Sequence, residues 1–357
     1  MAQIIKFELE KLCSRRIVWV GLLCLLFFNI AAVWNSQACQ YEVITLDGQM
    51  LSGGAGKQYI KERTEQYAGL LNDTKRDQIL KTERAADIMD YAYLDSLPLY
   101  TAMEENFASQ YGPFYGKSID EVYTQNGITV EVGNTDRWTR IFYYFQQMVM
   151  VLGIIIVIAV SGCFSEEYTR GTDALLLTSR HGKRKCAQAK VAASLLFTAA
   201  CYLGLLALNV IPFLLEDGLY GWDAGIQLDI INGLYNVPYT LNCGEAALIF
   251  LACGFLALLT MTAMTLLVSV WSRSSFIAII VSSLLYFMPM FLGNVLPNDI
   301  LCLTPIGAST TLALSLPKFH LVGLELFYQA KILFAAAAAL LLAWVLAGRV
   351  FAKHQVA

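Results

Sequence analysis

The sequence predicts an all-α polytopic membrane protein with six transmembrane helices, an N-terminal interfacial helix and a mainly helical extracellular domain, for which an α+β fold stays open. The first observation behind this prediction is composition: the 357 residues are 57% hydrophobic and 15% charged, whereas soluble domains carry about 25% charged residues. The second is that apolar residues gather in runs of about 20, the length that crosses a hydrocarbon layer of about 30 Å. The third is the uneven distribution of Lys and Arg between the loops.

Six apolar runs are long enough to be spans. The first five contain no Lys, Arg, Asp or Glu, and the sixth holds Lys331 near its start, where the long side chain can extend to the interface. Trp and Tyr residues mark several of their ends, which is typical of the headgroup level. The runs are residues 17–34, 141–163, 191–215, 246–271, 275–295 and 328–348.

The distribution of basic residues predicts the topology. The N-terminal segment carries four Lys and Arg, the loop after the second run six, the link after the fourth run one and the tail two, all on one side of a six-span arrangement. On the other side, 216–245 has none and 296–327 has only Lys318. The positive-inside rule therefore places both termini in the cytoplasm, and long translocated segments such as 35–140 are exempt from it.

Three regions follow from this pattern. The apolar stretch of the first run exceeds the 7–15 residues of a signal-peptide core, so we expect an uncleaved anchor. The predicted regions are 1–34 with the interfacial helix and first span, 35–140 as the extracellular domain, and 141–357 with spans two to six and a cytoplasmic coupling loop at 164–190.

The first 16 residues predict an amphipathic helix. Ala2, Ile5, Leu9 and Leu12 fall on one helical face, whereas Glu8 fits this pattern less well. A helix of this kind joined directly to a span is expected in the inner membrane interface. A frayed start of the chain is the alternative.

The extracellular domain is long enough to have its own core and is mildly anionic, with 16 acidic against ten basic residues in 35–140. Apolar spacing predicts helix within 57–96, and the ITVEV run predicts a short strand at 128–132. The later outer loops, 216–245 and 296–327, are too apolar for simple linkers. We interpret them as short helices at the outer leaflet, with ordinary packed loops as the alternative.

No motif supplies chemistry or energy. The glycine-rich run at 53–58 lacks the first Gly and the Ser or Thr of a phosphate-binding loop. No Asp or Glu lies within a span to couple an ion gradient. The three His residues, His181, His320 and His354, have no metal-ligand spacing. We therefore expect neither an enzyme nor an ion-coupled transporter, and energy has to come from a partner.

The loop at 164–190 carries the strongest functional signal. We expect a short amphipathic helix there, capped by Thr172, which transmits displacement to the spans on both sides. A basic loop that merely obeys the topology rule is the alternative. The features of the loop are, in order, Glu166 and Glu167, Gly171-Thr172, Leu175-Leu176-Leu177, the basic cluster from Arg180 to Lys185, and Lys190.

In these features the loop resembles the signature of permease subunits of type-2 ATP-binding cassette (ABC) exporters. The amphipathic start, the six spans, the cytoplasmic termini and the outer segment after the fifth span are similar too. The insertion at 35–140 is outside the resemblance, because many members have a short link there. A Pro often found after the Leu-rich stretch is absent, with Arg180 near its place.

The resemblance implies a separate ABC ATPase subunit that binds ATP and Mg²⁺, and no cofactor, metal or catalytic residue in this chain. It implies a second permease subunit, identical or related, and a translocation path in the plasma membrane of a bacterium. The lipid bilayer is the remaining partner, and no nucleic acid is expected. The residues expected to contact the ATPase are Glu166, Glu167, Arg170, Gly171, Thr172, Asp173, Leu176 and Arg180.

A second interpretation is an ABC-type mechanotransmission or sensory protein, whose extracellular domain binds a peptide or an envelope component without transport. Such proteins usually have four spans with a large domain between the first two. The position of 35–140 favours this interpretation, and six spans argue against it. The sequence leaves the transported substrate open.

Overall fold

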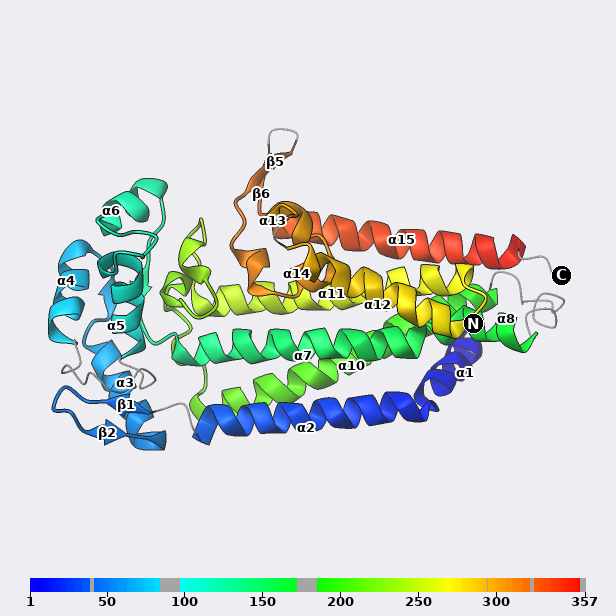
Figure 1. Ribbon diagram of the computed structural model, residues 1–357, viewed down its shortest axis with the longest axis horizontal. Helices are drawn as coiled ribbons and strands as arrows, with labels where there is room; N and C mark the ends of the chain where they lie inside the picture. The colour runs from blue at the N-terminus through cyan, green and yellow to red at the C-terminus, as the bar shows by residue number, and fades with distance from the viewer. Residues whose placement is uncertain (39–41, 84–96, 172–184, 294, 322–323, 354–357) are drawn as a thin grey trace. The chain divides into compact units, whose positions relative to one another are not determined.

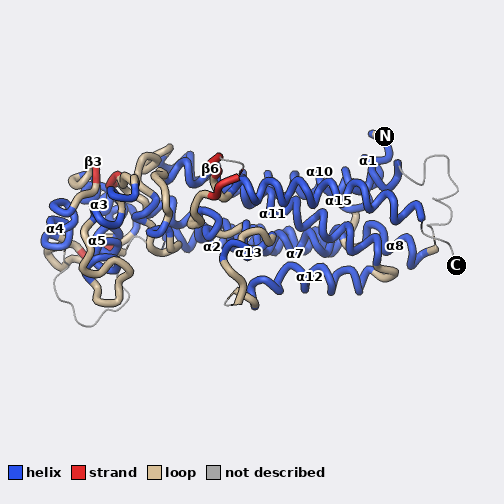
Figure 2. Tube along the Cα trace, turned by 90° about the horizontal axis from the view of Figure 1, so that it is seen from above, coloured by secondary structure: helices blue, strands red, loops and turns tan. Residues whose placement is uncertain are grey.

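A computed structural model describes residues 1–38, 42–83, 97–171, 185–293, 295–321 and 324–353, and the fold is mainly helical (Figures 1 and 2). The chain forms two compact units. The first comprises Met1–Asn29, Phe145–Ile211 and Phe250–Ala357, and the second comprises Ile30–Tyr144 and Pro212–Ile249. Each unit is therefore assembled from segments that are distant in the sequence.

Long apolar helices build the first unit and run alongside one another (Figures 1 and 2). Four helices are long and apolar enough to cross a bilayer, over Asp136–Thr169, Lys185–Leu215, Cys243–Trp271 and Gln329–Phe351. The bent pair Ala2–Cys13 and Arg16–Ala32 gives a fifth when it is counted as one span. The long helices are α2 (Arg16–Ala38), α7 (Asp136–Val160), α10 (Lys185–Asp217), α11 (Cys243–Trp271), α12 (Ser275–Phe291) and α15 (Gln329–Lys353).

The helix α12 corresponds to the fifth predicted span, 275–295, but is shorter. Its 17 residues extend about 26 Å at about 1.5 Å per residue, which is less than a hydrocarbon layer of about 30 Å. Leu292 leaves the helical conformation and ends it. The described residues thus contain four or five candidate spans, and the sixth span stays a prediction.

The N-terminal helix is confirmed as a separate element. Helix α1 (Ala2–Cys13) meets α2 at an angle of 67° (Figure 1). Leu12 is buried, as the amphipathic pattern predicts, and Phe7 is 64% exposed. Glu8, which fits that pattern poorly, is buried as well, and its partners explain why.

A short helix follows α7 after a turn at Ser161. This helix, α8 (Gly162–Arg170), ends where Gly171 adopts a left-handed conformation with a φ of 66° and donates to the last turn. Further back, α7 packs closely on α12. A Cβ added at Gly153 would lie 2.4 Å from the hydroxyl oxygen of Tyr286, so only glycine permits this approach.

The segment after α12 holds short elements. Thr304 caps α14 with its side chain, and a hairpin follows in which His320 pairs with Glu325. Short helices predicted within 296–327 are therefore present, and their position at a leaflet stays a prediction. The elements are α13 (Asn298–Leu301), α14 (Pro305–Ala308), a 3₁₀ turn (Thr311–Leu314), β5 (Phe319–Leu321) and β6 (Leu324–Leu326).

The second unit combines helices with very short strands, so the α+β alternative describes it. Two antiparallel pairs, β1–β2 and β3–β4, register Val43 with Leu51 and Leu70 with Glu131. Of the strand predicted at 128–132, only Glu131–Val132 forms a strand, as β4. The elements are β1 (Val43–Ile44), β2 (Met50–Leu51), α3 (Gly53–Glu65), β3 (Gly69–Leu70), α4 (Asp73–Thr82), α5 (Pro98–Met103), a π-helix (Glu104–Ala108), α6 (Ile119–Val122), a 3₁₀ turn (Thr124–Asn126) and β4 (Glu131–Val132).

The segment 212–249 also belongs to this second unit, which therefore extends beyond the predicted 35–140. It contains two 3₁₀ turns, Ile226–Leu228 and Leu234–Asn236, and Leu228 joins the hydrophobic core of the unit. The amide of Gly225 donates to the carbonyl of Glu131 at 2.8 Å. In the described residues this loop is packed against the unit, which was the alternative to helices at the outer leaflet.

Candidate functional site

Three helices meet around a buried lysine in the first unit. Lys190 of α10 is 1% exposed, and its Nζ lies 2.9 Å from Oε1 of Glu8 in α1 and 2.5 Å from Oε1 of Glu167 in α8. Both carboxylates are less than a tenth exposed. Lys11 of α1 adds a second cation 3.5 Å from the same oxygen of Glu167. One ammonium therefore connects α1, α8 and α10 out of contact with water.

A second ion pair connects α1 and α2 with α8. Arg15, in the turn between α1 and α2, places Nη2 2.7 Å from Oε1 of Glu166, and its Nη1 donates to the carbonyl of Ala159 at 2.9 Å. The guanidinium occupies space that a side chain at position 162 would fill. A Cβ on Gly162 would lie 2.6 Å from Arg15 Nη2, so a side chain there would displace the guanidinium from its present position.

The opposite side of α8 contacts three more helices. The amides of Phe164 and Ser165 donate to Oγ of Ser269 in α11 at 3.1 and 3.3 Å. The Ser165 hydroxyl donates to Ser275 of α12 at 3.1 Å, and the Phe164 ring lies 5.5 Å from the ring of Phe351 in α15. Helix α8 thus contacts each of the long helices that follow it in the sequence, α10, α11, α12 and α15.

The charges around α8 balance. Breaking a buried pair by removing one partner costs about 3–5 kcal/mol, because the other charge stays desolvated. With each carboxylate next to a cation, the arrangement fixes α1, α8 and α10 relative to one another. We call the six residues the ion-pair cluster: Glu8, Lys11, Arg15, Glu166, Glu167 and Lys190.

The predicted ATPase-contact residues separate into three groups. The Glu166 side chain is 25% exposed and Gly171 is exposed, whereas Glu167 is enclosed by Lys190 and Lys11 and faces inward. Arg170 is the last residue of α8. The remaining four, Thr172, Asp173, Leu176 and Arg180, lie outside the described residues.

Sequence reasoning did not identify Glu8, Arg15 and Lys190 as members of one site. A signal existed for Glu8, because it interrupts the apolar face of an amphipathic helix, where an isolated carboxylate needs a buried partner. For Lys190 the only signal was its position at the start of an apolar run. The pairing itself depends on contacts between segments more than 150 residues apart, such as Lys190 with Glu8 at a separation of 182.

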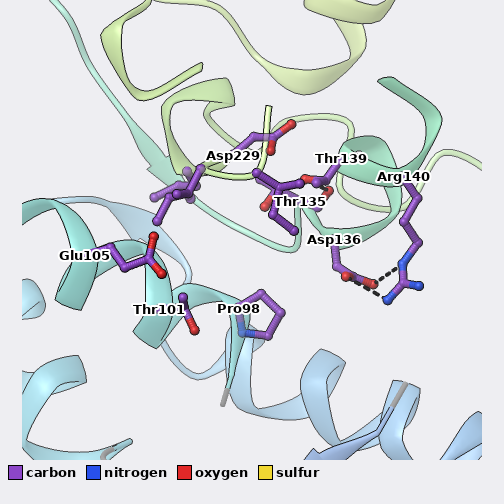
Figure 3. Close-up of a pocket in the computed structure, with 11 residues that line it drawn as sticks. Pro98, Thr101, Glu105, Thr135, Asp136, Thr139, Arg140 and Asp229 are labelled. Atoms are coloured by element: carbon purple, nitrogen blue, oxygen red, sulfur yellow. Dashed lines mark hydrogen bonds and ion pairs between the residues drawn. The ribbon is translucent and has the colours of Figure 1, made fainter. Parts of the chain in front are cut away.

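A second candidate site is a cavity of about 520 Å³ within the second unit (Figure 3). Pro98, Leu228, Ile230 and Ile231 supply apolar walls. The polar walls come from α5 with the following π-helix, from the start of α7 with the residue before it, and from Asp229. These polar residues are Thr101, Glu105, Thr135, Asp136, Thr139, Arg140 and Asp229.

The charged groups of the cavity differ in their surroundings. Asp136 and Arg140 form an ion pair with an Nη2–Oδ1 distance of 3.0 Å (Figure 3). Asp229 is 2% exposed and accepts hydrogen bonds from the backbone and side-chain amides of Asn232 at 3.2 and 2.7 Å. Burial raises the pKa of the Asp229 carboxyl from 3.8 to about 6, and the hydrogen bonds from Asn232 offset only part of this shift.

Comparison with known protein families identifies the family of this chain. A family model described as "ABC-2 family transporter protein" matches residues 2–356. No curated protein and no solved structure matches the chain. Because the match covers nearly the whole sequence, the chain belongs to the ABC-2 transporter family and is a membrane subunit of an ABC transporter.

Proposed function

We propose that this ABC-2 family chain is the membrane-spanning subunit of an ATP-driven exporter. A separate ATPase subunit binds ATP and Mg²⁺ and is coupled to this chain through α8. In this proposal six helices cross the plasma membrane of a bacterium, both termini are cytoplasmic and the second unit is extracellular. A second permease subunit, identical or related, completes the translocation path.

The observation that supports the proposal is the position of α8 among the long helices. Ion pairs join it to α1 and α10, serine hydroxyls join it to α11 and α12, and an aromatic contact joins it to α15. A force applied to a helix with these contacts is distributed to the whole first unit. A loop that served only topology would not need buried charges to hold it.

The ion-pair cluster makes this connection stiff. Moving α8 without α1 and α10 would separate Glu167 from Lys190, at a cost of about 3–5 kcal/mol for an uncompensated buried charge. A rigid displacement of the three helices avoids that cost. We therefore propose that closure of the ATPase dimer moves α8, α1 and α10 together.

The exposed part of α8 and the residues after it are the proposed contact with the ATPase. Glu166, Arg170 and Gly171 lie at this end, and Thr172, Asp173, Leu176 and Arg180 follow them. Glu167 differs from the others, because its carboxylate is occupied by Lys190 and Lys11. We assign Glu167 to transmission within this chain rather than to the contact surface.

A charge exchange tests the coupling. Arg15→Glu and Glu166→Arg each place like charges 2.7 Å apart in the native geometry, whereas the double variant restores an ion pair with reversed polarity. We expect both single variants to reduce the stimulation of the ATPase by the permease in the purified, lipid-reconstituted complex. The double variant should recover the part of the stimulation that depends on this ion pair, but not the part that depends on Glu166 as a contact with the ATPase. Assembly of each complex is checked by co-purification of the ATPase subunit.

The matched control is Lys6→Glu, because the ion pair of Lys6 with Glu10 is exposed and 3.9 Å long. Exposed pairs of this kind contribute about 0–1 kcal/mol, so stimulation should stay at the wild-type level. Equal stimulation in the wild type and in both assembled single variants would contradict the proposal.

A further inference from the structure

The second unit carries an unusual charge for its size. Residues 30–144 and 212–249 hold 21 of the 28 Asp and Glu residues and ten of the 25 Lys and Arg residues, a formal net charge of −11. The rest of the chain is correspondingly positive, because the whole chain has a net charge of −3. An electrostatic field of this sign concentrates cations at concave surfaces of the unit.

The cavity of Figure 3 lies within this anionic unit and has the size of a ligand site. Its volume of about 520 Å³ falls in the range of about 300–1,000 Å³ for small-molecule pockets. Leu228 is buried in its wall, and Ile231 is 73% exposed at its edge. The apolar side chains can bury the hydrocarbon part of a ligand, and the carboxylates favour a ligand with a positive charge.

Glu105 is an exposed carboxylate of the cavity lining, whereas Asp229 is buried and hydrogen-bonded to Asn232. Its side chain extends from its helix toward the wall that carries Thr135 and Asp136 (Figure 3). Within the described part of the chain Glu105 makes no ion pair, whereas Asp136 is held by Arg140. Glu105 belongs to the π-helix Glu104–Ala108, a rare conformation that is frequent at functional sites.

We propose that this cavity binds a primary ammonium group carried by an apolar body. The ammonium is neutralised by Glu105 and donates to the hydroxyls of Thr101 and Thr135, while the apolar part packs on Leu228 and Ile231. Asp229 is a third carboxylate of the lining, held by hydrogen bonds from Asn232, and adds negative charge to the cavity. The binding site does not depend on the proposed export function.

Other ligand classes fit the cavity less well. An anion would meet the carboxylates of Glu105, Asp136 and Asp229 against the single guanidinium of Arg140, which Asp136 already occupies. A metal ion needs three or more converging donors, and no such group of His, Cys, Asp and Glu occurs among the described residues. An organic cation needs only one carboxylate and an apolar wall, and both are present.

Hexylammonium is a probe with these two properties. Its binding to the full-length chain in lipid nanodiscs, without ATP, is measured by isothermal titration calorimetry and compared with that of hexanoate, which has the same apolar part and the opposite charge. We expect saturable binding of hexylammonium to the wild type and no binding of hexanoate. Glu105→Gln and Asp229→Asn should each weaken hexylammonium binding, the first by about tenfold or more.

Asp120→Asn is the control, because Asp120 is an exposed acid of the same unit that does not line the cavity. The affinity of Asp120→Asn for hexylammonium should equal that of the wild type. Since Glu105 is exposed, its substitution leaves the fold intact and the test stays decisive even where Asp229→Asn is unstable. The proposal would be overturned if the wild type and Glu105→Gln bound hexylammonium with equal affinity. It would also be overturned if the wild type bound hexanoate as well as hexylammonium. Neither result depends on transport or ATP hydrolysis.

Discussion

Replacing Lys190 by Met tests the ion-pair cluster most severely, because it removes the cation and keeps the length of the side chain. In the wild type, Nζ lies 2.9 Å from Glu8 and 2.5 Å from Glu167, and all three side chains are less than a tenth exposed. The substitution leaves two buried carboxylates, with Lys11 at 3.5 Å from one of them. We expect a loss of about 3–5 kcal/mol, the cost of an uncompensated buried charge.

The assay is thermal unfolding of the purified chain in detergent, in which this loss corresponds to a decrease in Tm on the order of 5–10 °C. A triple variant, Lys190→Met with Glu8→Gln and Glu167→Gln, separates charge from packing. It removes every charge of the triad, so no uncompensated buried charge is left. We therefore expect the triple variant to recover most of the lost Tm.

Lys6→Met is the control for this series, because Lys6 is an exposed lysine of α1, the helix that carries Glu8, and its ion pair with Glu10 spans 3.9 Å. Its Tm should equal that of the wild type. A Lys190→Met variant that unfolds at the wild-type temperature would refute the assignment of a buried, paired ammonium. A triple variant no more stable than Lys190→Met would show that packing, not charge, is responsible.

Three further predictions concern packing and pH. Gly153→Ala should destabilise the chain by about 1–3 kcal/mol in SDS unfolding, since its Cβ would lie 2.4 Å from the Tyr286 hydroxyl. Gly204→Ala is the control and should leave the stability unchanged, because no atom lies within 4 Å of its Cβ; equal effects of the two substitutions would contradict the packing of α7 on α12. Asn29→Leu should cost about 0.6–2 kcal/mol in the same assay through the lost hydrogen bond to α10, and an unchanged stability would argue against that bond. The pKa of Asp229 rises from 3.8 to about 6 on folding, so the stability gained from its protonated form is complete below about pH 4 and is lost as pH rises through 6. Asp229→Asn should therefore flatten the fall in Tm between pH 4 and 7, and an unchanged slope of Tm against pH would contradict this assignment.

Much of the fold followed from local composition. The runs at 191–215 and 246–271 are helical throughout, and those at 141–163 and 328–348 are helical except at Ser161 and Tyr328, because an uninterrupted apolar run leaves the backbone no other way to satisfy its hydrogen bonds in lipid. The end of α8 at Arg170 also has a local cause, since Gly171 adopts the left-handed conformation that glycine favours.

What the sequence could not provide was the set of contacts between distant segments. The loop at 216–245 has apolar residues that suit either a membrane surface or a protein core, and only the fold shows that Leu228 enters the core of the second unit. The ion-pair cluster has the same origin. Glu166 and Glu167 were recognised together as a surface motif, yet the fold directs Glu167 to Lys190 and Glu166 to Arg15.

The central claim is that a cytosolic ATPase contacts this chain at the end of α8. Thr169 is exposed there, so a photo-crosslinking amino acid in its place samples that contact in the assembled complex. The same group in place of Tyr111, which is 88% exposed in the second unit, is the control. We predict an adduct with the ATPase subunit from position 169, altered in yield by ATP, and none from position 111. An intact complex that gives no ATPase adduct from position 169, or an adduct from position 111, would contradict the account.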